Sequence, residues 1–225
     1  MDDLAIVCFS CDNNEEVWPT FMTCLDKYWP NHPITYLLTE TLSYPYMHTI
    51  NYNYDINSWS TRIYKSLEDI KENKIVFICD DCFLNAPVNI EKLKQALAII
   101  KDNTATVNFE LSFREEDMDC EYEGFKYKPF NTPCRLSFLC GLWDKEKLID
   151  ILKISNSNPW DLEDKQDSKG YDIYQVADSK ILSWFRDGPY QFAAAFRGLW
   201  SRELPEFLEK EGITMDYDKK GFYDE

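Results

Sequence analysis

The sequence predicts an α/β fold in which a doubly wound, mostly parallel sheet is followed by a less regular second half. Two observations predict it. Short apolar runs alternate with amphipathic segments through residues 1–110, an order typical of a parallel sheet with crossover helices. The run Ile75–Cys79 carries no charged residue, as expected of a strand that is covered on both faces. With 225 residues, the chain suits a single domain with a substantial core.

The first elements follow one another closely. Leu4–Phe9 is a short apolar run that predicts a strand. Glu15–Trp29 predicts a helix, because Val17, Phe21, Leu25 and Tyr28 recur on one helical face. Two further strands are expected, at Ile34–Leu38 after Pro33 and, with a weaker pattern, at Met47–Tyr52.

The alternation then continues to residue 110. Trp59–Ile70 predicts a helix with Ile63, Leu67 and Ile70 on its inner side. The strand Ile75–Cys79 follows. Pro87–Ile100 predicts a helix whose apolar residues are again in helical phase, and Thr104–Phe109 is β-branched enough for a further strand.

The second half has fewer periodic segments. We expect a strand at Arg135–Cys140, a helix at Lys145–Lys153, and a helix at Ser201–Gly212 that Ser201 caps and Gly212 ends. Between them lie aperiodic polar or acidic segments, interpreted as loops at Arg114–Thr132 and Ser155–Gly170. The tail Asp216–Glu225 is mostly charged, and we expect it to be mobile.

The net charge of the chain excludes some classes of binding partner. The formal net charge is −16, which argues against nonspecific binding to nucleic acid or to an anionic membrane, since these need a cationic face. The N-terminus lacks the basic start and apolar core of a signal peptide. No apolar run approaches the roughly 20 residues of a membrane span. We therefore expect a cytoplasmic protein without a transmembrane segment. Any association with a membrane would be peripheral and mediated by binding partners.

Two adjacent carboxylates follow the most apolar strand. Asp80 and Asp81 come directly after Ile75–Cys79, and ligands of open α/β sheets lie outside the carboxyl ends of the strands. Two acids placed there require a cation, hydrogen-bond donors or a raised pKa. The pair therefore predicts a site for a divalent metal or a polyhydroxylated ligand. The alternative is an exposed pair that begins a turn or caps the next helix.

The cysteine spacing suggests a second metal pattern. Cys8 and Cys11, with Cys79 and Cys82, mimic a four-thiolate zinc site. However, Cys8 and Cys79 lie in strand-like runs, where residues three apart point to opposite faces. We interpret these residues instead as free thiols in a reducing compartment.

Several short motifs follow one another along most of the chain: Ser10-Cys11-Asp12 with Trp18, Tyr28-Trp29-Pro30, Trp59-Ser60-Thr61-Arg62, Asp80-Asp81-Cys82-Phe83-Leu84, Arg135-Leu136-Ser137, Gly141-Leu142-Trp143, Pro159-Trp160-Asp161-Leu162-Glu163 and Arg197-Gly198-Leu199-Trp200. Their order resembles that of a bacterial glycosyltransferase family with the nucleotide-diphosphosugar-transferase (GT-A) fold. It implies one GT-A-like domain with a Rossmann-like, nucleotide-sugar-binding half (1–110), an acceptor-side half (111–215) and the charged tail (216–225).

The chain departs from the family pattern at two positions. Asp80-Asp81-Cys82 stands where the superfamily usually has Asp-x-Asp, and relatives often carry an aromatic residue at Cys82. Leu199 stands where relatives tend to carry a polar or basic residue. The first departure bears on metal dependence, and the second on a contact to the diphosphate.

The resemblance implies a donor site at the carboxyl edge of the sheet. Asp80 and Asp81 are the candidates for holding Mn²⁺ or Mg²⁺, and Asp80 also for donor hydroxyls. Ser10, Asp12, Trp59, Ser60 and Arg62 complete the proposed donor site. The guanidinium of Arg62 could bind phosphate without a metal. The alternatives are a turn and helix cap at Ser10 and Asp12, a cap and staple at Trp59 and Ser60, and a surface salt bridge at Arg62.

Acceptor chemistry needs a base and a surface for a sugar. Glu163 and Asp161 are the candidate catalytic acids, because they flank Trp160, whose face could stack on an acceptor sugar. The alternative is an acidic surface loop in which Trp160 fills the core.

The leading hypothesis is a hexosyltransferase-type glycosyltransferase, inverting or retaining, that uses a nucleotide-sugar donor. Its acceptor would be a glycan or a lipid-linked molecule of bacterial surface-polysaccharide synthesis. One rival is a sugar-nucleotide nucleotidyltransferase, which normally needs a Gly-rich basic loop after the first strand; here residues 10–16 are acidic and contain no Gly. The other is a non-catalytic nucleotide- or carbohydrate-binding module.

Overall fold

A computed structural model of the chain describes residues 3–52, 57–101, 103–109, 118–119, 122–130, 135–154, 157–165, 170–187 and 193–223. Its strands are β1 (Leu4–Phe9), β2 (Thr35–Thr39), β3 (His48–Asn51), β4 (Lys74–Cys79), β5 (Thr104–Asn108), β6 (Met118–Asp119), β7 (Phe125–Tyr127), β8 (Cys140–Asp144), β9 (Asp172–Val176), β10 (Ala195–Phe196) and β11 (Leu199–Trp200). Its helices are the 3-10 helix η1 (Asp12–Val17) and the α-helices α1 (Trp18–Tyr28), α2 (Trp59–Glu68), α3 (Ile90–Ile99), α4 (Lys145–Leu152), α5 (Pro159–Lys165) and α6 (Leu204–Glu211).

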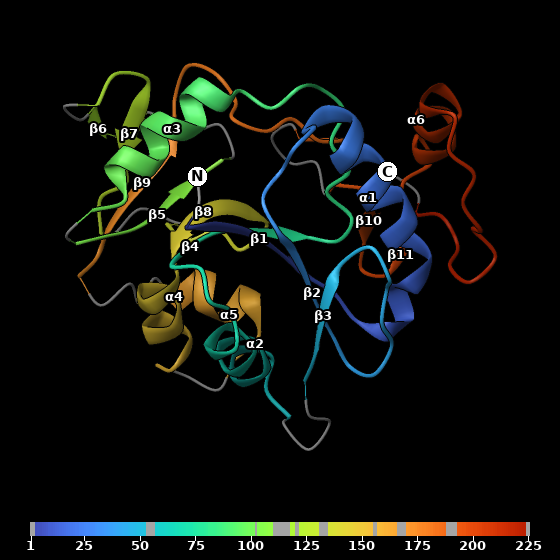
Figure 1. Cartoon of the computed structure of the whole chain (residues 1–225), viewed down its shortest axis with the longest axis horizontal. Helices are drawn as coiled ribbons and strands as arrows, with labels where there is room; N and C mark the ends of the chain where they lie inside the picture. The colour runs from blue at the N-terminus through green and yellow to red at the C-terminus, as the bar shows by residue number, and fades with distance from the viewer. Residues whose placement is uncertain are drawn as a thin grey trace.

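Within the described residues, nine strands form one mixed sheet in the order β3-β2-β1-β4-β8-β5-β9-β7-β6 (Figure 1). β1 pairs in parallel with β2 and with β4, β2 with β3, and β5 with β9. β8 is antiparallel to both β4 and β5, and β7 is antiparallel to β9 and β6. Seven of these nine strands therefore run in one direction, which confirms the mostly parallel sheet.

Helices cover both faces of the sheet. Alternate residues of β4 belong to different cores: Val76 and Ile78 pack with the apolar faces of α1, α3 and α6. Ile75 and Phe77 pack with those of α2, α4 and α5. Figure 1 shows α2, α4 and α5 grouped together on one side of the sheet. This two-sided burial explains why the strand carries no charge between residues 75 and 79, and it confirms the doubly wound arrangement.

The sheet has a topological switch point beside β1. The chain runs from β1 outwards to β2 and β3, then returns to place β4 on the opposite side of β1. Crevices at such switch points, outside the carboxyl ends of the strands, are where ligands bind in open α/β sheets. Ser10, Glu40, Tyr52 and Asp80 directly follow β1, β2, β3 and β4, so all four lie at this edge.

The first-half helices differ from the sequence prediction mainly at their starts. The predicted helix Glu15–Trp29 divides into η1 and α1, with Asn14 non-helical inside η1 and Pro19 in the first turn of α1. α3 begins at Ile90 rather than at Pro87, because the Asn89 side chain accepts a hydrogen bond from Lys92 N and caps the helix there.

Three predictions for the second half are wrong. The predicted strand Arg135–Cys140 lies one segment too early, since β8 spans Cys140–Asp144. The predicted loop Ser155–Gly170 contains α5. The N-cap of α6 is Glu203 rather than Ser201, although Gly212 does end that helix with φ 71°. Most of Arg114–Thr132 lies outside the described residues, and the described part carries β6 and β7.

The C-terminal tail makes main-chain hydrogen bonds with β11 at the end of its described part. Trp200 N donates to Gly221 O at 2.8 Å, and Tyr223 N donates to Trp200 O at 3.0 Å. Residues 213–223 are called the C-terminal strap below, and the end of this strap, Gly221–Tyr223, runs beside β11. No helix in the described part of the chain is long and apolar enough to cross a membrane.

Candidate functional site

Asp80 lies at the switch point and is almost fully buried, with 2% of its surface exposed. Its Oδ2 accepts hydrogen bonds from Ser10 Oγ at 2.5 Å and from Asn14 Nδ2 at 2.9 Å. Ser10 Oγ in turn accepts from Trp18 Nε1 at 2.7 Å. Burial raises the pKa of Asp80 although both hydrogen bonds oppose the shift. β1, η1 and β4 are thereby joined across the switch point.

Asp81 is also buried, but its surroundings are different. Its Oδ2 accepts Ala195 N at 3.0 Å, and its main-chain oxygen accepts Ala194 N at 3.2 Å. Its Oδ1 is buried and has no hydrogen-bond partner among the described residues. Burial, followed by the charge of Asp80, raises the pKa of Asp81 to about 7. The alternative of an exposed acid pair is therefore wrong.

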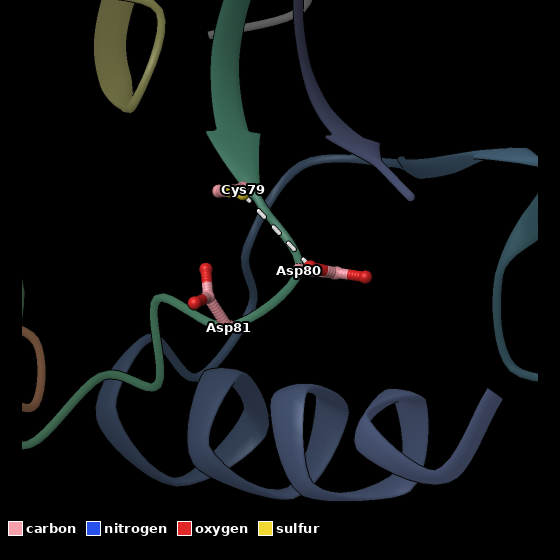
Figure 2. Close-up of side chains that lie close together, drawn as sticks. All are labelled: Cys79, Asp80 and Asp81. Atoms are coloured by element: carbon pink, nitrogen blue, oxygen red, sulfur yellow. Dashed lines mark hydrogen bonds between the residues drawn. The ribbon is translucent and has the colours of Figure 1, made fainter. Parts of the chain in front are cut away.

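Cys79 completes the only cluster of three or more metal-donor side chains in the described part of the chain. Its Sγ and one carboxylate oxygen each of Asp80 and Asp81 lie within 4.8 Å of one another. Figure 2 shows the three side chains at the end of β4, with the two carboxylates leaving the chain in different directions. Oxygen ligands on opposite sides of a divalent ion are about 4.4 Å apart, so the spacing is near what one ion requires.

The donor chemistry of this cluster fits a divalent metal. The buried, unpartnered Asp81 Oδ1 needs either a proton or a cation. Carboxylates suit Mg²⁺ and Mn²⁺, whereas a thiolate also suits softer ions. Cys79 donates to Asp80 Oδ1 across 3.9 Å, and burial raises the pKa of this thiol well above its usual value. A bound metal would have to displace the thiol proton before sulfur could serve as a ligand.

Asp12 and Glu40 link the loops after β1 and β2. Asp12 accepts hydrogen bonds from Thr39 Oγ1 and from the main-chain N–H groups of Thr41 and Leu42. Desolvation opposes the shift, but the hydrogen bonds from Thr41, Leu42 and Thr39 hold the pKa of Asp12 below its usual range. Glu40 accepts from Asp12 N. The structure therefore places Asp12 at the start of η1, where its side chain binds the loop after β2 at the edge of the candidate site and does not cap its own helix.

Arg62 projects from α2 towards the same edge. Its guanidinium lies over the Tyr52 ring at 5.2 Å, and its Nη1 is 3.8 Å from Glu40 Oε1. Its Nε is buried without a hydrogen-bond partner among the described residues. Tyr52 donates to Ser10 O. Arg62 is thus joined to the Ser10 loop through an aromatic ring and a long ion pair, which leaves donor capacity on the guanidinium.

Trp59 and Ser60 turn towards protein rather than towards the acid pair. The Trp59 ring meets Phe9 and Phe138 edge to face at 5.9 Å and 5.5 Å. Ser60 is fully buried, and its Oγ accepts Ser157 N at 3.2 Å. These contacts anchor α2 to β1 and to the segment before α5. The N-cap of α2 is Ser58, which accepts from Thr61 N.

The three predicted acceptor-side residues lie on α5. Trp160 is 70% exposed, so the alternative in which it fills the core is wrong. Asp161 is exposed and exchanges hydrogen bonds with Asn158 at the start of the helix. Glu163 is half-buried, and its Oε1 accepts Phe138 N at 2.7 Å. The main-chain oxygen of Leu139, next to Phe138, accepts Cys79 N at 3.0 Å, so the segment that binds Glu163 also pairs with the end of β4.

The hairpin β10–β11 borders the site. Arg197 and Gly198 both have positive φ, 51° and 78°, which lets the chain reverse in two residues. A positive φ is costly for Arg, and such strain gathers near functional sites. Leu199, 40% exposed, follows the turn. Because Ala194 and Ala195 bind Asp81, the hairpin is fixed against the acid pair.

Sequence reasoning missed three polar residues of this region. Glu40 follows β2 as Asp80 follows β4, so the same edge argument could have found it. Asn14 lies in the segment after β1, but no spacing distinguishes it. Lys220 contacts Asn14 from 206 residues away, and no local pattern indicates a contact of that kind.

The chain matches no protein-family model and no curated protein. Solved structures share its fold. CMP:2-keto-3-deoxy-manno-octonic acid synthetase complexed with CTP has a TM-score of 0.54 and 11% identity, covering 92% of this chain and 95% of that one. Bifunctional IspDF from Campylobacter jejuni has a TM-score of 0.52 and 9% identity, covering 95% and 55%. TarS 1-349 from S. aureus in complex with UDP-GlcNAc has a TM-score of 0.51 and 12% identity, covering 87% and 62%.

At such low identities these likenesses establish the fold and nothing beyond it. The chain spans 55% of IspDF and 62% of the TarS fragment. The α/β, Rossmann-like architecture expected from the sequence is therefore confirmed, and the activity has to be argued from the site.

Proposed function

We propose that this protein is a glycosyltransferase that transfers a sugar from a nucleotide-diphosphosugar donor to a glycan or lipid-linked acceptor in surface-polysaccharide synthesis. The observation that carries the proposal is the acid pair at the switch point. Asp81 Oδ1 is buried beside the buried Asp80, without a hydrogen-bond partner in the described part of the chain. A protein retains two such acids at a ligand-binding edge when a ligand compensates them. The shared fold, which also occurs in TarS with UDP-GlcNAc, supports the same reading.

The donor would lie over the carboxyl ends of β1, β2 and β4. Asp80 and Asp81, with Cys79, would hold Mn²⁺ or Mg²⁺. When bound, such an ion would neutralise the charge of the leaving diphosphate. Arg62 has an Nε without a partner among the described residues, and its Nη1 makes only a long ion pair of 3.8 Å with Glu40 Oε1, so its fork would bind a phosphate oxygen. Ser10 and Asp12 would border the nucleoside. Trp59 and Ser60 would support the donor site indirectly by anchoring α2, since their contacts are with protein.

The acceptor would approach from α5. The exposed Trp160 offers a flat apolar face for a sugar ring, and Asp161 beside it offers hydrogen-bond acceptors for hydroxyls. In the transfer step, the acceptor oxygen forms a bond to the anomeric carbon while the bond to the diphosphate oxygen breaks. The acceptor proton passes to Glu163, which its hydrogen bond to Phe138 N holds in place.

Thermal unfolding with nucleotides tests the proposal. Purified protein would be heated with UDP, GDP, CMP or dTDP, each with and without Mn²⁺, and Asp81→Ala would be compared with Asp69→Ala. Asp69 is an exposed residue at the end of α2, so it controls for loss of an acid. A ligand present at 100 times its Kd stabilises the native state by about 2.7 kcal/mol. We expect one nucleotide to stabilise the wild type and Asp69→Ala in a Mn²⁺-dependent manner, and Asp81→Ala much less.

Each outcome points to a different conclusion. A shift that is independent of Mn²⁺ would move phosphate binding to Arg62. Equal shifts in the wild type and Asp81→Ala would remove the metal site from the proposal. Absence of a shift with every nucleotide would refute it. Binding without turnover of any donor sugar would leave the non-catalytic module, and pyrophosphate release from CTP or UTP would identify a nucleotidyltransferase.

A further inference from the structure

The C-terminal strap brings a buried lysine to the candidate site. The side chain of Lys220 is only 7% exposed. Its Nζ lies 4.5 Å from the centroid of the Trp200 ring. The strap is held beside β11 by main-chain hydrogen bonds on both sides of Trp200. The ammonium is therefore placed by the main chain and by an aromatic surface, whereas the neighbouring Lys219 is 45% exposed and pairs with Glu15.

Lys220 determines which way the Asn14 amide faces. Its Nζ is 2.7 Å from Asn14 Oδ1 and 2.7 Å from Glu16 Oε1. An ammonium group can only donate hydrogen bonds, so Asn14 must present its carbonyl oxygen to it. The amide NH₂ then necessarily faces the other way, where Nδ2 is 2.9 Å from Asp80 Oδ2. The lysine thus acts on Asp80 through this amide, in addition to the direct effect of its charge.

A second relay reaches the same oxygen from the opposite side. The indole N–H of Trp18 can likewise only donate, and it occupies Ser10 Oγ at 2.7 Å. The Ser10 hydroxyl is 2.5 Å from Asp80 Oδ2 and 3.4 Å from Cys11 O, so its proton is directed to Asp80. Trp18 and Lys220, which can only donate hydrogen bonds, thus stand at the outer ends of two relays. As a result, Ser10 and Asn14 both present a donor to Asp80 Oδ2.

The two oxygens of Asp80 therefore have different roles, one binding protein groups and the other facing the metal-donor cluster. Oδ2 is occupied by Ser10 and Asn14, whereas Oδ1 turns to Cys79 Sγ in the metal-donor cluster. We propose that Lys220 is a positioning residue: through Asn14 it fixes the orientation of Asp80, so that the C-terminal strap controls divalent-metal affinity. This inference rests on the proposed function, because it assumes that the cluster takes a divalent ion.

Titration with Mn²⁺ alone tests the inference without nucleotide or turnover. Free Mn²⁺ would be followed by electron paramagnetic resonance for the wild type, Lys220→Met, Lys220→Arg and the matched control Lys219→Met. Loss of a partner that orients a ligand typically weakens metal affinity about 10–100-fold. We expect a loss of this size in Lys220→Met, little change in Lys219→Met, and substantial recovery in Lys220→Arg, which is also donor-only.

Two further variants separate positioning from folding. Lys220→Met with Glu16→Gln removes both members of the buried ion pair, so this variant keeps the net charge of the region and serves if Lys220→Met alone does not fold. In Asn14→Ala, Lys220→Met should cause little of the loss that it causes in the wild type, because the amide link is already removed and only the direct effect of the lysine charge remains. A purely structural lysine would lower the melting temperature but leave the Mn²⁺ affinity of the folded protein unchanged.

The outcomes distinguish the two proposals. Wild-type protein that binds no Mn²⁺ would overturn the metal site of the proposed function and this inference with it. Wild-type protein that binds Mn²⁺ with the same affinity as folded Lys220→Met would overturn only the role of Lys220. Losses in Asn14→Ala and Lys220→Met that add independently would also refute the relay.

Discussion

Replacing Asp81 with Asn should stabilise the protein without metal at alkaline pH while it removes metal binding. Asn keeps an oxygen that can accept Ala195 N, as Asp81 Oδ2 does. It removes the charge that is buried without compensation on Oδ1 and that repels Asp80. The substitution therefore isolates the electrostatic cost of the acid from its packing.

The size of the effect follows from the pKa. Asp81 has a pKa of about 7 in the folded protein, against about 3.9 for an unperturbed Asp. Between these values the folded state holds a proton that the unfolded state has released, so the free energy of unfolding falls as the pH rises. The penalty is absent below pH ~4 and complete above pH ~7, and three pKa units correspond to about 4 kcal/mol. Between pH 5 and pH 8 the change is about 2–3 kcal/mol.

Urea unfolding at pH 5 and at pH 8 measures this difference. Repulsion among the other acids of a chain with net charge −16 also changes with pH, so the relevant quantity is the wild type compared with Asp81→Asn. Asp69→Asn, which alters an exposed acid, should behave as the wild type. Mn²⁺ should stabilise the wild type more at pH 8 than at pH 5, and Asp81→Asn at neither. Equal pH dependence in the wild type and Asp81→Asn would refute the reasoning.

Two other substitutions test the remaining roles. Glu163→Gln keeps an acceptor for Phe138 N but removes the base, so donor binding should persist while transfer falls about 10²-fold. Glu206→Gln, which changes an exposed residue of α6, is the control, and a fully active Glu163→Gln would exclude this base. Cys79→Ser replaces a soft donor with a hard one, so Cd²⁺ affinity should fall much more than Mg²⁺ affinity. Thiolate–Cd²⁺ absorption in the near ultraviolet would report this, and its absence in the wild type would exclude sulfur as a ligand.

Much of the first half, residues 1–110, was predictable because local patterns determine it. A strand buried on both faces must be apolar at every position, and β4 shows this signal. Parallel strands bring their carboxyl ends to one edge, so the position of Asp80 at the switch point follows from the order of the elements. The burial of both acids could not be read from the sequence, because it depends on η1 and the hairpin β10–β11 closing over them.

The second half was less predictable for physical reasons that particular residues show. β8 contains Gly141, which weakens any strand pattern; yet a Cβ there would lie 3.3 Å from both Val107 O and Thr106 Oγ1, so close packing of β5 favours glycine. α5 is only seven residues long, and these include the exposed Trp160 and several acidic residues, so the helix shows little apolar periodicity. The tail seemed mobile by composition, whereas Lys220 is buried by contacts with residues more than 200 positions away.

The two adjacent acids have different surroundings and would contribute differently to a cation site. Asp80 is oriented by donors that end in Trp18 and Lys220, and these offset part of its burial. At Asp81, hydrogen bonds from the Cys79 thiol and from Ala195 N lower the pKa, but burial outweighs them, so the cost of burying this acid remains largely uncompensated. A protein selected for stability alone would not keep this arrangement, since Asn at position 81 would remove the repulsion. We infer that the free-energy cost of burying the two acids is retained because a cation bound between them offsets it. The instability of the metal-free protein would then add to the affinity for the cation.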